Sequence, residues 1–251
     1  MSRSRPRFVE WNNDICTLRF KTSQPEGEPL DLRRIERIRE PVTRSKRTFR
    51  AKVPDVRQAC SQHCESLNEM KAVIILIVCA HADVLKMQPF QMTYKDGGKT
   101  HRYTPDVLLA WGNDLWAIEI KEDKKADIPK EKARFELIAS LLATHRINFK
   151  LWKKSEFCVE PRLATSCSLI RYQRCPVSPS DKEHLRQKFA ETPLIALGEL
   201  GDSDIRSVLR LIIEGHFHID WSSKLTRFSW VSVFPIGKQS WPAAHPSAEL
   251  R

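Results

Sequence analysis

Three charged residues near the middle of the chain have the types and spacing to do chemistry on a bound metal. Asp106 follows Pro105, and after a gap of twelve residues come Glu119 and Lys121, separated by Ile120. Side chains alternate across a strand, so Glu119 and Lys121 would project from one face. Two carboxylates supply the hard oxygen ligands that Mg2+ takes beside phosphate oxygens, and the metal can then activate a water. We therefore expect Asp106 and Glu119 to hold magnesium, with Lys121 placing the water or stabilising developing charge.

The segments that carry these residues are strand-like. Residues 114–121 have apolar side chains on both faces, which predicts a covered central strand. Residues 101–111 predict an earlier strand, held extended before a proline, that would bring Asp106 beside Glu119. The alternative is an edge strand on which the carboxylate and the ammonium form a solvated pair of little energetic value. The apolar residues on the same face argue against that alternative, because a buried charge needs a partner or a metal.

At these residues the chain resembles the PD-(D/E)XK nuclease superfamily, and more narrowly the TnsA-type endonucleases of cut-and-paste transposons. Three further motifs carry the narrower resemblance: Ser66-Leu67-Asn68-Glu69 is similar to the S-x-x-E of the family's first helix, Gln88-Pro89 to its Q-P before the first strand, and Arg102-Tyr103-Thr104-Pro105-Asp106 to its R-Y-T-P-D. The resemblance covers about residues 60–155. It implies an α/β fold, a restriction-endonuclease-like mixed sheet flanked by helices.

The resemblance also implies the site residues. The family's catalytic Glu, Asp and Lys correspond to Glu69, Asp106 and Lys121, and Glu119 takes the place of the strand carboxylate or amide two residues before the lysine. The metal ligands would be Glu69, Asp106 and Glu119. Glu65 stands four residues before Glu69 and would share its helical face, so it could replace Glu69 as a ligand. We rank Glu69 first.

The activity that the resemblance implies is magnesium-dependent cleavage of double-stranded DNA at the 5′ ends of a transposon. It implies two protein partners, an integrase-like transposase that handles the 3′ ends and an ATPase regulator contacted through the C-terminal region. Two alternatives stay open. A stand-alone restriction or repair nuclease with the same core would cut without partners, and a non-catalytic DNA-binding adaptor would use the acidic site only for structure.

A net charge of +11 points to a polyanionic partner, and much of it is concentrated before residue 58. Residues 33–57 contain ten basic and three acidic residues. With prolines inside it and little apolar periodicity, this stretch predicts an extended basic arm over residues 1–55 that follows phosphates without reading sequence. A solvated basic tail without a ligand is the alternative. The residues expected to bind DNA are Arg44, Lys46, Arg47, Arg50 and Lys52.

Apolar periodicity predicts the remaining elements. A nuclease domain over residues 56–169 would open with a helix at about 56–81, followed by strands at about 90–94, 101–111 and 115–121, a helix at about 129–145 and a strand at about 147–152. A C-terminal domain over residues 170–251 would contain a first helix that begins near residue 180, helices at about 193–200 and 203–214, and a hairpin from 216 to 234. Ser180 to Glu183 has the form of a capping box. Three helices and a hairpin predict a winged helix, and its acidic third helix favours a protein partner over the major groove.

Composition limits the remaining possibilities. Seven cysteines without paired C-x-x-C spacing favour a reducing compartment, and the longest apolar run, residues 72–80, is too short to span a membrane. The N-terminal residues show no apolar secretory segment, so we expect a cytoplasmic protein.

Overall fold

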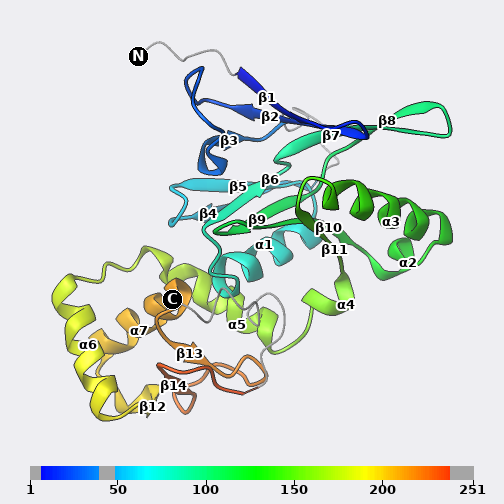
Figure 1. Cartoon of the computed structure of the whole chain (residues 1–251). Helices are drawn as coiled ribbons and strands as arrows, with labels where there is room; N and C mark the ends of the chain where they lie inside the picture. Colours follow the sequence, from blue (N-terminus) through cyan, green and yellow to red (C-terminus); the bar gives the residue numbers. More distant parts are fainter. Residues whose placement is uncertain (1–6, 40–48, 238–251) are drawn as a thin grey trace. The chain divides into compact units, whose positions relative to one another are not determined.

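The computed structural model describes residues 7–39 and 49–237, which form two compact units (Figure 1). The first unit contains the described residues up to 54 together with residues 61–70 and 83–156, and the second contains residues 55–60, 71–82 and 157–237. The candidate residues 69, 106, 119 and 121 all belong to the first unit. In the described parts of the chain, no helix has the length and apolar character needed to cross a membrane.

A four-stranded mixed sheet positions the candidate site. Its order is β11-β10-β9-β6, from β11 (Ile147–Lys153), β10 (Asp114–Lys121), β9 (Val107–Trp111) and β6 (Val84–Met87). The central strand β10 runs antiparallel to β9 and parallel to β11. A parallel neighbour requires a crossover connection, and α2 (Asp123–Ala126) and α3 (Pro129–Ala143) supply it. The predicted covered central strand at 115–121 and the parallel strand after it are therefore confirmed.

A second sheet in the first unit contains five antiparallel strands. Its order is β1-β2-β7-β8 with β3 paired to β2, from β1 (Arg7–Asn12), β2 (Cys16–Thr22), β3 (Ile35–Glu36), β7 (Phe90–Asp96) and β8 (Lys99–Tyr103). The short helix η1 (Leu32–Arg34) precedes β3. The β7–β8 hairpin turns at Gly97 and Gly98, both at positive φ, which glycine adopts without steric cost.

The two sheets and α3 share one hydrophobic core. It contains Leu18, Phe20, Phe90, Met92 and Tyr103 from the five-stranded sheet, Leu108, Ala117 and Ile147 from the four-stranded sheet, and Phe135, Ile138 and Leu142 from α3. The strand that carries the candidate Glu and Lys is thus fixed from several elements at once.

Residues 1–55 were expected to be an irregular arm, and this is wrong for much of their described part. Residues 7–22 form β1 and β2, and residues 51–55 form β4 (Ala51–Asp55). In β2, Leu18 and Phe20 alternate with Arg19 and Lys21, and the apolar pair is fully buried. Counting charged residues alone suggested an irregular segment, because the charged side chains of this strand lie on its more exposed face. The alternation of apolar and charged residues that is typical of a strand is nevertheless present in the sequence.

The expected helix over residues 56–81 is wrong in its first part. Residues 60–64 form β5 (Cys60–Cys64), which pairs with β4, and the helix α1 spans Leu67–Cys79. Ser66 precedes the helix and its Oγ accepts a hydrogen bond from the Glu69 N–H at 3.1 Å. A serine in this position begins a helix, which is why helical structure starts after it.

The expected single strand at 101–111 is divided between two sheets. Its first half belongs to β8 in the five-stranded sheet and its second half to β9 in the four-stranded sheet. Pro105 lies at the break between the two strands. Because proline has no backbone N–H, it cannot donate a hydrogen bond to a neighbouring strand. Asp106 therefore lies in the connection that leads from one sheet to the other.

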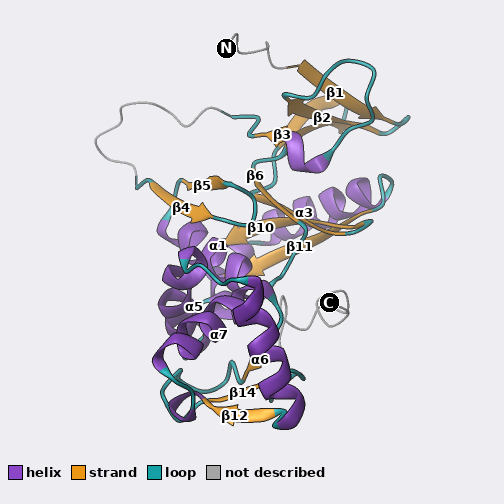
Figure 2. Ribbon diagram, turned by 90° about the vertical axis from the view of Figure 1, so that its left-hand side faces the viewer, coloured by secondary structure: helices purple, strands orange, loops and turns teal. Residues whose placement is uncertain are grey.

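The second unit combines helices with a small sheet (Figure 2). Besides most of α1 it contains α5 (Arg162–Leu169), η2 (Ile170–Arg174), α6 (Pro179–Glu191), β12 (Leu194–Ala196), η3 (Leu197–Glu199), α7 (Asp202–Glu214), β13 (His218–Ile219) and β14 (Trp230–Ser232), and α4 (Lys154–Phe157) ends at its boundary. The three strands pair antiparallel in the order β12-β14-β13.

Two expectations for this unit are corrected. The segment expected as a helix at 193–200 is the strand β12 followed by the single turn η3. The capping box of α6 is formed by Ser178 and Asp181 rather than by Ser180 and Glu183, because Ser178 Oγ accepts from the Asp181 N–H and Asp181 accepts from the Ser178 N–H, both at 3.0 Å.

Candidate active site

Asp106 is fixed beside the central strand by its backbone and its side chain. Its N–H donates to the Ile118 carbonyl at 3.0 Å, and its Oδ2 accepts from the Ile120 N–H at 2.8 Å. These two bonds flank Glu119 in the sequence of β10. The sequence prediction that Asp106 lies beside Glu119 is confirmed, although through a connection between sheets rather than within one long strand.

Glu119 is held at both of its oxygens. The Lys121 ammonium lies 2.7 Å from Oε1, and the Tyr103 hydroxyl donates to Oε2 at 2.8 Å. Glu119 is 6% exposed and Tyr103 is 3% exposed, so water competes little for either bond. A carboxylate offers about four lone-pair positions, so two stay available for a further ligand.

The charges that act most strongly on Asp106 are negative. Burial raises its pKa well above the ordinary range, and the neighbouring Glu119 raises it further, while the Ile120 N–H lowers it. Glu69 also raises this pKa and Lys121 lowers it, both to a smaller extent. In residues 7–39 and 49–237, no lysine or arginine forms an ion pair with Asp106. Two carboxylates thus share one ammonium, an arrangement that a cation would stabilise.

Lys121 and Tyr103 keep their protons in this environment. Burial lowers the pKa of Lys121, but the carboxylate of Glu119 and the charge of Asp106 outweigh that effect, and the net pKa is raised. Burial raises the pKa of Tyr103, and Glu119 and Asp106 add to this. The lysine is therefore a cation, and the neutral tyrosine hydroxyl donates a hydrogen bond to Glu119.

These side chains line a cavity of about 230 Å3. The cavity is lined by Asp106, Glu119, Lys121, Tyr103 and Thr104, and by three arginines, Arg39, Arg102 and Arg134. The sequence predicted a role at the site for the first three and not for the other five. Arg102, Tyr103 and Thr104 stand directly before Pro105 and Asp106 in the R-Y-T-P-D motif, which was the available signal. Arg39 and Arg134 come from distant segments, and only the fold shows that they converge here.

Both carboxylate oxygens of Glu69 accept hydrogen bonds at the start of α1. Its Oε1 accepts from the Ser66 hydroxyl at 2.9 Å and its Oε2 accepts from the Glu65 N–H at 2.8 Å. It acts on Asp106 through its charge but does not line the cavity. The premise for Glu65 as a substitute is wrong, because Glu65 lies before the helix and its carboxylate forms an ion pair with Arg37.

The donor set fits a divalent ion held mainly by two carboxylates. In the described residues there is no cluster of three or more His, Cys, Asp or Glu side chains placed to hold a metal. Asp106 and Glu119 nevertheless line one cavity with their charges only partly compensated. One or two carboxylates with phosphate oxygens and waters are the usual coordination of Mg2+.

The residues expected to bind DNA lie away from this cavity or outside the described chain. Arg44, Lys46 and Arg47 fall outside the described residues. Arg50 and Lys52 are exposed, the second within β4, and neither lines the cavity. Two other basic residues of the stretch 33–57 form structural hydrogen bonds, because Arg37 donates to the His63 carbonyl and Arg57 donates to the Ile77 carbonyl, both at 2.9 Å.

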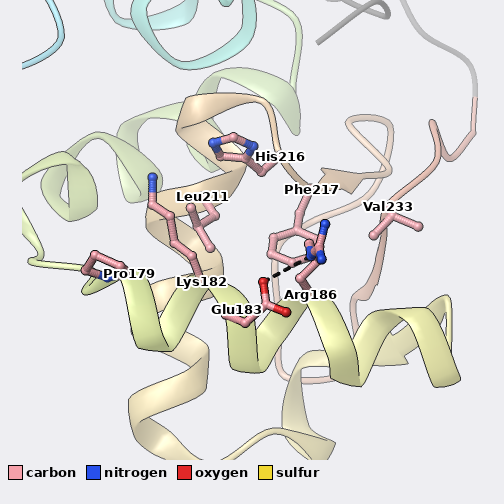
Figure 3. A pocket seen from close by; sticks show the side chains of 8 residues that line it. All are labelled: Pro179, Lys182, Glu183, Arg186, Leu211, His216, Phe217 and Val233. Atoms are coloured by element: carbon pink, nitrogen blue, oxygen red, sulfur yellow. Dashed lines mark ion pairs between the residues drawn. The ribbon is translucent and has the colours of Figure 1, made fainter.

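A second cavity, of about 410 Å3, lies in the second unit (Figure 3). Lys182, Glu183 and Arg186 project toward it from α6, and it is also lined by Leu211, Phe217 and Val233. Glu183 forms an ion pair with Arg186 at 3.1 Å, marked by the dashed line. Among the lining residues only Glu183 and His216 are of types that bind metals, and Glu183 is paired, so this cavity does not bring two carboxylates together.

Comparison with known proteins agrees with the location of the site. Residues 84–154 match the family model of the TnsA-like endonuclease N terminal domain. No curated protein matches the chain. The match confirms the resemblance to TnsA-type endonucleases of the restriction-endonuclease-like superfamily, and the mixed α/β structure fits that fold. The matched segment contains Asp106, Glu119 and Lys121, and it supports a nuclease.

Proposed function

We propose that the chain is a magnesium-dependent DNA endonuclease with Asp106, Glu119 and Lys121 at its reacting centre. The observation that carries the proposal is the pair of carboxylates sharing one cavity with a lysine inside the TnsA-like segment. An ion pair made only for stability would match one carboxylate to one ammonium. Here a second carboxylate, with a raised pKa, is left without a cation.

Asp106 and Glu119 would hold the metal, and Glu69 would join them after releasing its hydrogen bond from the Ser66 hydroxyl or from the Glu65 N–H. The bound ion would supply a water activated for attack and would offset charge on the phosphate. Asp106 is fixed toward β10 by the Ile120 N–H. Lys121 holds one oxygen of Glu119 and, as a cation, would stabilise the charge that develops on the phosphate. Tyr103 positions the other oxygen of Glu119.

We further propose the transposon setting that the family resemblance implies. The enzyme would cut the 5′ ends of the element beside an integrase-like transposase, and its C-terminal region would contact an ATPase regulator. The two helices and three-stranded sheet of residues 179–232 support a winged-helix-like module. Several acidic side chains there are engaged internally, because Asp204 pairs with Lys188 and Glu214 pairs with Lys182, both at 3.0 Å. The acidic side chains of this region are therefore weaker support for a protein partner than the sequence alone indicates.

The test is DNA cleavage by the purified chain. Wild type, Asp106→Asn and the control Asp96→Asn, an exposed aspartate at the β7–β8 turn, are incubated with end-containing DNA and Mg2+ or EDTA, with and without an integrase-like transposase as candidate partner. We expect magnesium-dependent and partner-dependent cutting by wild type and by Asp96→Asn, and none by Asp106→Asn. Cutting without the partner would favour a stand-alone nuclease. Complex formation without any cutting would favour the non-catalytic adaptor.

A further inference from the structure

Three arginines from separate parts of the chain meet at the cavity of the candidate active site. Arg39 follows β3, Arg102 lies in β8 and Arg134 lies in α3, and all three line the cavity that contains Asp106 and Glu119. We call them the arginine rim. All three are exposed, so their guanidinium groups can reach a ligand that lies over the cavity.

The arginine rim forms few ion pairs with other side chains of the described chain. In the described part of the chain, Arg39 and Arg102 form no ion pair. Arg134 pairs with Glu131 one turn away on the same helix, at 3.3 Å. A largely solvated helical ion pair of this kind contributes little to stability, so a more strongly charged anion can displace it.

Arg134 is nevertheless oriented toward the site by aromatic rings. Its guanidinium carbon lies 5.9 Å from the ring centroid of Tyr103 and 5.5 Å from that of Phe135. Such cation–π contacts stabilise a guanidinium over a ring face. Tyr103 is the residue that donates to Glu119, so Arg134 lies next to the side chains that position the catalytic carboxylate.

The charge of the cavity specifies an anionic ligand. Lys121 and the arginine rim supply four cationic groups, against the carboxylates of Asp106 and Glu119, and Lys121 already pairs with Glu119. A guanidinium binds phosphate oxygens through two parallel N–H bonds, which matches a phosphodiester. The volume of about 230 Å3 is below the usual range for an enclosed small-molecule site, so an extended chain lying across the opening is the better fit.

Thr104 gives a second indication of a missing ligand. It is 8% exposed and lines the same cavity, and its hydroxyl has no hydrogen-bond partner in the described structure. A buried hydroxyl without a partner is unfavourable. A phosphate oxygen, or a water bound with it, would supply one after a small movement of the side chain.

We propose that Arg39, Arg102 and Arg134 bind successive backbone phosphates of a DNA strand and hold the scissile bond over Asp106 and Glu119. This inference rests on the proposed nuclease function and deepens it. It assigns the phosphate contacts of the site to the arginine rim, in addition to the basic residues at positions 44–52. The contacts carry no base information, so they apply to any DNA sequence.

The test is DNA binding in EDTA, where cleavage cannot occur. Affinity for a short duplex of arbitrary sequence is measured across a salt series by fluorescence anisotropy for wild type and for the triple variant Arg39→Gln, Arg102→Gln, Arg134→Gln. Each lost phosphate contact lowers the slope of log affinity against log salt by about 0.9. We therefore expect the triple variant to lose about 2–3 units of slope and to bind at least tenfold more weakly at low salt.

A matched control removes the same charge elsewhere in the first unit. Lys95→Gln, Lys99→Gln and Lys130→Gln are combined in one variant, because these lysines are exposed and do not line the cavity. Loss of affinity in the rim variant and not in the control supports the inference. Equal losses in both, or none in the rim variant, would overturn it. Melting curves verify that both variants fold.

A second measurement separates this inference from the proposed function. Arg134→Lys keeps the charge but removes the two parallel N–H bonds, so we expect a cleavage rate reduced about 10-fold or more with little change in salt slope. If wild type binds DNA through the rim but never cuts, the function fails and the inference stands. If wild type cuts and the rim variants bind and cut as well as it does, the function stands and the inference fails.

Discussion

The hydroxyl of Tyr103 offers a sharp test of how the site is assembled. Tyr103→Phe removes one oxygen from a buried side chain and keeps the ring that packs in the core and lies near Arg134. What is lost is the 2.8 Å hydrogen bond to Glu119 Oε2. Glu119 then retains Lys121 as its partner but can rotate about the remaining bond.

The size of the effect follows from the nature of the bond. A hydrogen bond to a charged group contributes about 1.5–3 kcal/mol, and each 1.36 kcal/mol corresponds to tenfold in rate. We expect Tyr103→Phe to reduce the cleavage rate about 10- to 100-fold, the range also found when partners of metal ligands are removed. The free energy of unfolding should fall by about 1–3 kcal/mol, because an acceptor is left buried without its donor.

The assay combines single-turnover cleavage, a Mg2+ titration of the rate, and the rise in melting temperature caused by Mg2+. Tyr103→Phe should need more magnesium for half-maximal rate and should be stabilised less by it. The control is Tyr94→Phe, which alters a tyrosine buried in the same core. Wild-type rate and magnesium dependence in Tyr103→Phe would refute the view that this hydroxyl positions Glu119.

Three other predictions follow from the described contacts. Glu69→Gln should reduce the cleavage rate at least tenfold with a small change in melting temperature, whereas Glu65→Gln should lower the melting temperature and leave the cleavage rate intact. If paired measurements of rate and melting temperature give the opposite pattern, the roles of Glu69 and Glu65 are reversed. Burial raises the pKa of Glu214, but the hydrogen bond from Lys182 and nearby positive charge lower the pKa by more, so the net pKa is below the ordinary glutamate value. Its contribution to stability is therefore present above the ordinary glutamate pKa and is lost as the pH falls through the lowered value, so Glu214→Gln should flatten the acid limb of a urea-unfolding series. Gly215 ends α7 at φ +84, where an added Cβ would lie 3.0 Å from a ring atom of His81. Gly215→Ala should therefore lower the melting temperature by several degrees, which corresponds to about 1 kcal/mol or more of unfolding free energy.

The reacting residues could be predicted because their signals are local. A strand with apolar residues on both faces that still carries Glu119 and Lys121 requires a reason for the buried charges, and Asp106 after a proline supplies a second carboxylate. The same local reasoning misplaced Asp106 within one long strand. Pro105 interrupts the ladder there, and whether a chain continues in the same sheet or enters another is decided by tertiary packing.

The remaining errors have two physical origins. Helical and strand periods are hard to separate in short segments, so residues 60–64 were assigned to a helix although Ser66 marks where that helix begins. The residues around the reacting groups were missed because their proximity is not local in sequence. Arg39 and Arg134 are 95 positions apart, and nothing in the sequence near either one indicates that both line the cavity with Asp106.

The proposed nuclease activity requires that Asp106 and Glu119 bind a divalent cation. Isothermal titration calorimetry with Mg2+ or Mn2+ tests this on the full chain, comparing wild type with Asp106→Asn and with the exposed control Asp96→Asn. We predict a saturable site in wild type and Asp96→Asn that is lost in Asp106→Asn. Equal binding by all three proteins, or binding by none, would contradict the assignment of Asp106 and Glu119 as metal ligands.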